Sequence, residues 1–274
     1  MPHIDLMADR DPVRIYCEQS GEGEAVVLLH GNFTDCRIWD NAMAKLSKSN
    51  RVIRYDQRGY GQSDAPKGPF APVQDLLELM DRLGISRAAF VGSSSGGALA
   101  LDFALLHPER TSALVLAAPS VSGNGLPVRM LLKGMQNYRR ARKLGTAAAI
   151  EHFANDPYWS YFFPPPDKTD ARDHVLANVR KPGNFCRFPP QYAKAPRPPA
   201  WKRLRELTAP ALIVVGDQDH TFNVSTARKL HGKLPDSELA VMKGCGHLPY
   251  VEEPDEFVQL ALRFLRQQGG RAPS

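Results

Sequence analysis

The stretch VGSSSGG, Val91–Gly97, places three serines between glycines, directly after an apolar run and before an Ala- and Leu-rich one. A sharp turn from a strand into a helix strains its central residue, and glycines two positions to either side avoid Cβ clashes. Only Ser94 has glycines at both of those positions, Gly92 and Gly96. The pattern therefore predicts Ser94 at a tight strand-to-helix turn, where a helix N-terminus favours developing negative charge.

Apolar, β-branched runs recur along the chain and are typical of parallel strands covered on both faces. Amphipathic helical patterns lie between them, and the N-terminal segment alternates weakly, like an antiparallel pair at one sheet edge. Strand–helix alternation of this kind predicts an α/β fold with a mostly parallel central sheet flanked by helices. The strand-like runs are Ala25–His30, Arg51–Asp56, Ala88–Gly92, Ala113–Pro119, Ala211–Asp217 and Leu239–Gly244.

The alternation stops between residues 123 and 209 and then resumes. Eleven of the 23 prolines gather in this segment, together with helical patterns and the aromatic-rich stretch PYWSYFFPPP. We interpret residues 123–209 as a mainly helical cap inserted into an α/β core formed by residues 1–122 and 210–274.

A serine hydroxyl at neutral pH needs a base, and the base needs an acid. His247 lies in a glycine-flanked loop after the last strand pattern and is the candidate base. The run ending at Val215 leads into two acids, Asp217 and Asp219. We prefer Asp219, which lies further out on the loop, and expect Asp217 to brace the turn.

Acyl transfer also needs donors placed for an oxyanion. The backbone N–H of Ser95, just after Ser94, is one candidate. The loop after the first parallel strand offers a second, for which we choose the N–H of Asn32, with Phe33 as the alternative.

These residues resemble those of the α/β-hydrolase superfamily, whose nucleophile stands in a G-x-S-x-G turn and precedes its acid and base in the chain. The resemblance rests on LLHGN, YDQRGYGQSDAP, VGSSSGG, LHPER, VVGDQD and GCGHLPYVEEP, in the family's order. It implies that Ser94 is the nucleophile, Asp219 the acid and His247 the base, with Asn32 and Ser95 as the oxyanion hole. The stretch SSSGG differs from the family's common SMGG, because Ser95 stands in the methionine position.

The activity implied is cleavage of a small carboxylic ester or lactone through an acyl-enzyme intermediate. The alternatives are a C–C bond hydrolase or lyase using the same triad, and a ligand-binding receptor on this fold. Phe33, Trp159 and Phe162 are candidate substrate contacts, although cap aromatics also serve to hold a cap on its core.

Charge and composition limit the classes of molecule that the protein is expected to bind. The chain of 274 residues has a formal net charge of +6, and residues 123–209 hold sixteen Lys and Arg against six Asp and Glu. This basic segment would suit an anionic small-molecule substrate or would simply be a solvated surface. We expect no nucleic-acid or membrane partner, no metal or cofactor, four free cysteines, a cytoplasmic location, and a monomer or homodimer.

Overall fold

A computed structural model describes residues 3–7, 12–185 and 188–269 of the chain. Its described strands form one eight-stranded sheet in the order β1-β2-β4-β3-β5-β6-β7-β8. The expected α/β fold with a mostly parallel sheet is confirmed. The strands are β1 (His3–Leu6), β2 (Val13–Ser20), β3 (Ala25–Leu29), β4 (Arg51–Tyr55), β5 (Ala88–Ser93), β6 (Thr111–Ala117), β7 (Ala211–Gly216) and β8 (Ser237–Met242).

β1 and β2 form the expected antiparallel edge, and all pairs from β4 to β8 are parallel. Central strands such as β5 and β7 are buried along their whole length, which explains their continuous apolar sequences. Because parallel strands share a direction, the carboxyl ends of β5, β6, β7 and β8 lie at one edge of the sheet.

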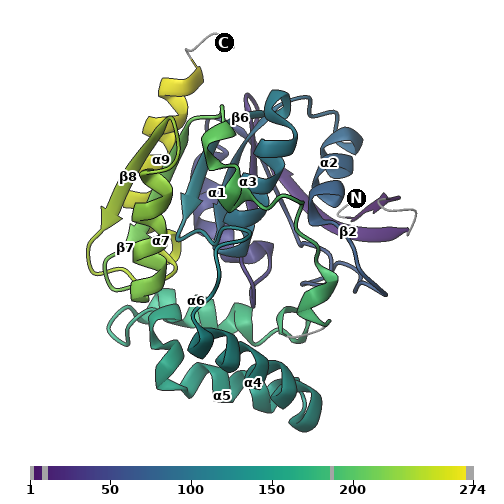
Figure 1. The fold of residues 1–274 in the computed structure, drawn as a ribbon, viewed down its shortest axis with the longest axis vertical. Helices are drawn as coiled ribbons and strands as arrows, with labels where there is room; N and C mark the ends of the chain where they lie inside the picture. The colour runs from purple at the N-terminus through teal and green to yellow at the C-terminus, as the bar shows by residue number, and fades with distance from the viewer. Residues whose placement is uncertain (1–2, 8–11, 186–187, 270–274) are drawn as a thin grey trace.

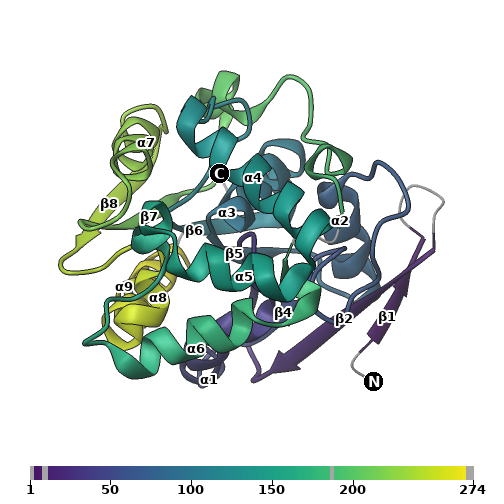
Figure 2. The same cartoon turned by 90° about the horizontal axis from the view of Figure 1, so that it is seen from below.

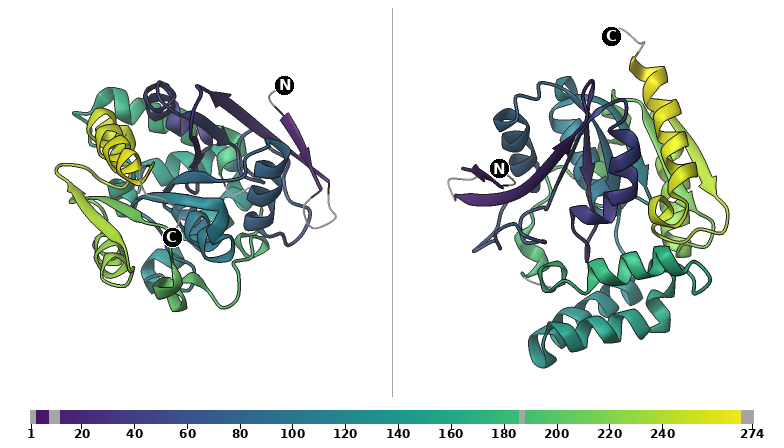
Figure 3. Two further views of the ribbon diagram at one scale, coloured as in Figure 1. Left: turned by 90° about the horizontal axis from the view of Figure 1, so that it is seen from above. Right: turned by 180° about the vertical axis from the view of Figure 1, so that it is seen from behind.

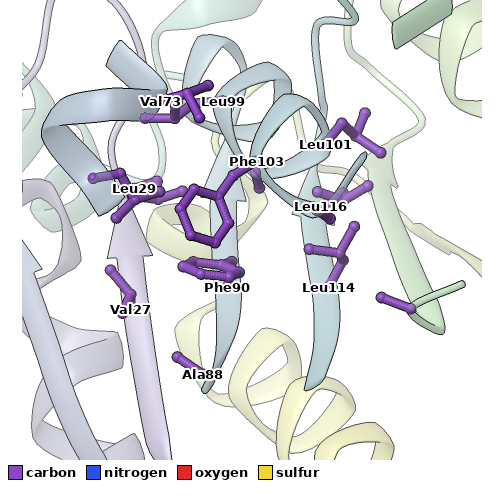
Figure 4. Close-up of a cluster of buried hydrophobic side chains, with 14 of the residues drawn as sticks. Val27, Leu29, Val73, Ala88, Phe90, Leu99, Leu101, Phe103, Leu114 and Leu116 are labelled. Atoms are coloured by element: carbon purple, nitrogen blue, oxygen red, sulfur yellow. The ribbon is translucent and has the colours of Figure 1, made fainter. Parts of the chain in front are cut away.

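Helices cover both faces of the sheet (Figures 1 and 3). The helices α2 (Pro72–Arg82), α3 (Ser95–Leu106) and α7 (Thr221–His231) cover one face, and α1 (Asp40–Leu46), α8 (Pro249–Glu252) and α9 (Pro254–Gly269) cover the other. Figure 4 shows the central contact of the first layer, where Phe103 of α3 packs on Phe90 of β5 with ring centroids 4.9 Å apart. This packing fixes α3, and with it the turn that precedes it.

Between β6 and β7 the chain forms α4 (Val128–Leu144), α5 (Thr146–Asn155), the 3-10 helix η4 (Pro157–Phe162) and α6 (Thr169–Val179), then short 3-10 turns. Figures 1 and 2 show these helices gathered below one edge of the sheet. The division into a core and a cap domain at residues 123 and 209 stays a prediction. No helix within the described ranges is long and apolar enough to cross a membrane.

Candidate active site

The strand-to-helix turn at Ser94 has the geometry that its glycines predict. β5 ends at Ser93, α3 begins at Ser95, and Ser94 itself has φ 51° and ψ −115°. A Cβ on Gly96 would lie 2.2 Å from the carbonyl oxygen of Leu29. A larger residue would therefore push α3 away from β3, and the tight turn that exposes Ser94 would be lost.

The acid and base come from the loops after β7 and β8. His247 Nδ1 lies 2.9 Å from Asp219 Oδ2, and both residues are buried, with 6% and 7% of their surfaces exposed. A carboxylate at this nitrogen fixes the imidazole with its proton on Nδ1, which leaves Nε2 as the base.

Asp217 has the separate role expected of it. Its Oδ1 accepts a hydrogen bond from the N–H of Gly244, 2.8 Å away, and so joins the loop after β7 to the loop after β8. Gly216 allows the two loops to approach closely, because a Cβ there would lie 2.1 Å from the carbonyl oxygen of Cys245. Asp219, and not Asp217, contacts His247.

Asn223 is a site residue that the sequence analysis missed. Its Nδ2 donates to Asp219 Oδ1 at 2.8 Å and lies 3.2 Å from His247 Nδ1. The N–H of His220 donates to the same oxygen at 2.6 Å. Asp219 Oδ1 is therefore occupied by two donors, and Oδ2 is left to face His247. Asn223 lies in the first turn of α7, and the only signal in the sequence was its position just after the Asp219 loop.

The Ser94 hydroxyl forms no hydrogen bond with any described residue, so it is unconstrained at the carboxyl edge of β5. Its own backbone is held on both sides, since the N–H donates to Ala117 at 3.0 Å and the carbonyl accepts from Ser120 at 2.9 Å. Ser94 is half-buried, whereas Ser93 is fully buried and its hydroxyl faces the buried hydroxyl of Tyr250. Of these two serines, Ser94 is the one a substrate can reach.

The loop after β3 lies directly against this serine. A Cβ on Gly31 would stand 3.1 Å from Ser94 Cβ, which places the Gly31–Asn32 peptide beside the nucleophile candidate. The side chain of Asn32 is turned away and accepts a hydrogen bond from Tyr60 Oη at 2.8 Å. Neither the N–H of Asn32 nor that of Ser95 donates to a described group. Two donors for an oxyanion need to be free in this way.

An aromatic cluster joins the loop after β3 to the 3-10 helix η4. Phe33 packs on Trp159 and Phe162 with centroids 6.4 and 6.2 Å apart, and Phe162 packs on His247 at 5.8 Å. Trp159 and Phe162 are 6% exposed, whereas Phe33 is half-buried. Trp159 and Phe162 are thus mostly covered where the segment between β6 and β7 meets the loop after β3, which leaves Phe33 the most accessible of these three candidate substrate contacts.

The loop that carries Gly246 and His247 is held by hydrogen bonds from two sides. The N–H of His247 donates to the carbonyl of Tyr161 at 2.9 Å. Both carboxylate oxygens of Glu252 accept from the N–H of Gly246, at 2.9 and 3.0 Å, and burial raises the pKa of this carboxyl group. Lys168 pairs with Glu253 at 2.7 Å and lies 4.0 Å from Glu252. His247 is therefore fixed by both the core and the segment between β6 and β7.

The thiols of the three described cysteines take no part in this site. Cys17, Cys36 and Cys245 are buried free thiols, and burial raises the pKa of Cys17 and Cys245 to about 12, so neither is a thiolate at neutral pH. Cys186 lies outside the described residues. Over the described ranges, no group of three His, Cys, Asp or Glu side chains is arranged to hold a metal ion.

Comparisons with known proteins agree with this fold. The family model described as alpha/beta hydrolase fold matches residues 24–254. The chain belongs to the α/β-hydrolase family. It is 31% identical over 268 residues to the 2-hydroxy-6-oxononadienedioate/2-hydroxy-6-oxononatrienedioate hydrolase of Comamonas testosteroni, covering 92% of this chain and 91% of that protein.

Two solved structures extend the likeness to this α/β-hydrolase chain. An enol-lactonase from Burkholderia xenovorans LB400 superposes with a TM-score of 0.78 at 25% identity, covering 96% of this chain and 100% of that one. A thermophilic esterase from Thermogutta terrifontis gives 0.81 at 22% identity, covering 98% and 99%. The esterase's identity supports the fold alone. The three proteins compared above are hydrolases, and this α/β-hydrolase chain is an enzyme of that kind.

Proposed function

We propose that the protein is a serine hydrolase that cleaves a small carboxylic ester or lactone through an acyl-enzyme intermediate. The observation that carries the proposal is the buried Asp219–His247 pair, 2.9 Å between Oδ2 and Nδ1, at the sheet edge where Ser94 stands with an unpartnered hydroxyl. In this proposal Ser94 is the nucleophile, His247 the base and Asp219 the acid, all carried by loops or turns at the carboxyl ends of β5, β7 and β8.

The mechanism follows from these roles. His247 Nε2 takes the proton of Ser94, whose oxygen attacks the substrate carbonyl, and the N–H groups of Asn32 and Ser95 stabilise the oxyanion. His247 then gives its proton to the leaving oxygen and the acyl group stays on Ser94. A water deprotonated by His247 attacks this ester in turn, and collapse of the second tetrahedral intermediate frees the acid.

The surroundings of Ser94 support an ester or lactone over a substrate with charged carboxylates. The substrate in the name of the Comamonas testosteroni relative is a dioate, which needs cations to replace its hydration. Among the described residues, Arg and Lys side chains of the cap segment stack on Tyr158 and Phe163, and none stacks on Phe33 or Phe162. The rings of Phe33 and Phe162, which pack on each other and on His247, suit a neutral acyl group.

The test is turnover of a panel of p-nitrophenyl esters and lactones, measured for the wild type, Ser94→Ala and Ser93→Ala. We expect Ser94→Ala to lose at least about 10³-fold in kcat, because the nucleophile is gone. Ser93→Ala is the matched control within the same triplet, and it should stay active. A fluorophosphonate should label the wild type and Ser93→Ala but not Ser94→Ala.

Equal activity in the wild type and Ser94→Ala would refute the assignment of the nucleophile. A wild type that is labelled by the fluorophosphonate, ignores every ester and lactone, and cleaves a 2-hydroxy-6-oxo-dienoate would refute the substrate class while keeping Ser94 as nucleophile.

A further inference from the structure

The Gly31–Asn32 peptide lies against Ser94, and its orientation decides whether an oxyanion meets a donor. The N–H of Asn32 and the carbonyl of Gly31 belong to the same planar, trans peptide group, so they point in opposite directions. Whatever fixes the Gly31 carbonyl therefore fixes the direction of the Asn32 N–H. Glycine itself supplies little restraint, because it lacks the Cβ that limits rotation of the backbone.

Two buried side chains meet at the Gly31 carbonyl. His30 Nδ1 lies 2.8 Å from this oxygen, and Thr34 Oγ1 donates to it at 3.0 Å. His30 is 0% and Thr34 1% exposed, so no water competes for these bonds. The oxygen thus has both of its acceptor positions occupied by protein donors.

The hydrogen bonds around His30 also fix its tautomer. The backbone N–H of Gln57 points at Nε2 from 3.0 Å, so Nε2 must be the acceptor and the ring proton must lie on Nδ1. The side-chain Nε2 of Gln57 in turn donates to the His30 carbonyl at 2.6 Å. Burial lowers the pKa of His30, which keeps the ring neutral. Nδ1 is therefore a fixed donor aimed at the Gly31 carbonyl.

We propose that His30 and Thr34 are positioning residues that hold the Gly31–Asn32 peptide with its N–H toward the oxyanion. The proposal rests on the acyl transfer proposed at Ser94. Two donors on the carbonyl also polarise the peptide, which makes its N–H a stronger donor. The left-handed φ of 68° at Phe33 marks a loop that its surroundings force into one conformation, as a preformed oxyanion site requires.

Thr34 offers a matched pair of variants. Thr34→Val keeps the shape and removes the hydroxyl, whereas Thr34→Ser keeps the hydroxyl and removes a methyl group. We expect Thr34→Val to lower kcat on the best ester about 10-fold or more, since a single oxyanion donor is worth roughly 10²–10³-fold. KM and the pH profile of kcat/KM should stay unchanged, because the substrate contacts and the Asp219–His247 pair are untouched. Thr34→Ser should retain most of the wild-type kcat.

A second measurement follows the oxyanion directly. A boronic acid forms a tetrahedral adduct with an active serine and places an oxygen where the oxyanion develops. Its affinity should fall in Thr34→Val by about the same factor as kcat. At His30, His30→Asn keeps a donor near the position of Nδ1 and His30→Leu does not, so the first should retain more activity and more boronate affinity than the second.

The proposal is overturned if Thr34→Val keeps the wild-type kcat and boronate affinity, or if Thr34→Ser loses as much as Thr34→Val, which would indicate packing alone. Thermal unfolding of each variant shows that the comparison is made on folded protein. Failure of the underlying function would appear differently, as a wild type that neither turns over esters nor loses activity on Ser94→Ala.

Discussion

At the scale of single residues, two carboxylates that stand only two positions apart after β7 have different partners. Asp219 contacts His247 through Oδ2, and Asp217 accepts the N–H of Gly244 through Oδ1. The sequence indicated both roles from position alone, because a carboxylate further along the loop reaches further from the strand end. It did not indicate Asn223, whose importance depends on where the Asp219 side chain turns.

Asp219→Asn should therefore lower kcat by about 10³- to 10⁴-fold while leaving the protein folded. An amide group in place of Oδ2 favours the imidazole tautomer that is protonated on Nε2, which cannot accept the Ser94 proton. Asp217→Asn is the matched control, because an amide oxygen still accepts the N–H of Gly244. Ester hydrolysis by both variants would check the assignment, and an equal loss of kcat in the two would contradict it.

At the scale of elements, helix starts show what local sequence rules capture and what they miss. α3 begins at Ser95, directly after the packed turn at Ser94, and so holds Gly96 and Gly97 in its first turn. α7 begins at Thr221, where His220 Nδ1 accepts the N–H of Phe222 at 3.1 Å. Histidine is not among the usual helix caps, so the start of α7 could not be predicted from residue preferences.

α3 also carries a buried carboxylate whose titration bears on stability. Asp102 Oδ1 accepts from Ser122 Oγ at 2.6 Å, and Ser122 Oγ in turn accepts the N–H of Ala200 at 2.9 Å. Asp102 is 6% exposed, and burial raises its pKa to about 6. The folded protein therefore holds a proton on Asp102 at pH values where the unfolded chain has released it.

The free energy of unfolding should fall as pH rises from about 4 to about 6, because the folded state binds more protons than the unfolded state in this range. The contribution of Asp102 is up to about 3 kcal/mol, at 1.36 kcal/mol for each unit of pKa difference. Asp102→Asn should lack this component, being neutral at every pH. Urea unfolding of both proteins between pH 4.5 and 7.5 measures it, and parallel pH profiles would show that Asp102 does not titrate in this range.

At the scale of the whole molecule, the sequence predicted the α/β core and helices between β6 and β7, but not how the segment is attached. One attachment is a buried polar network in which Asp35 accepts from Asn178 and Asn184, each at 2.8 Å. Another joins Tyr161 to His247. These partners are 86 or more positions apart, and no local pattern marks such pairs, since they arise only when the chain is packed.

Both attachments end beside the candidate site. Asp35 lies on the loop that carries Asn32 and Phe33, and His247 is the candidate base. The segment between β6 and β7 is therefore packed against both the oxyanion loop and the base loop. The reaction that this arrangement would support is the formation of a covalent acyl group on Ser94.

Acid quench during the first turnovers of an ester, followed by peptide mass spectrometry, tests that claim most directly. We expect one added acyl group, located on Ser94, absent from Ser94→Ala, and formed as the first equivalent of alcohol is released. Turnover that proceeds with the acyl group on another residue, or that continues unchanged in Ser94→Ala, would contradict it.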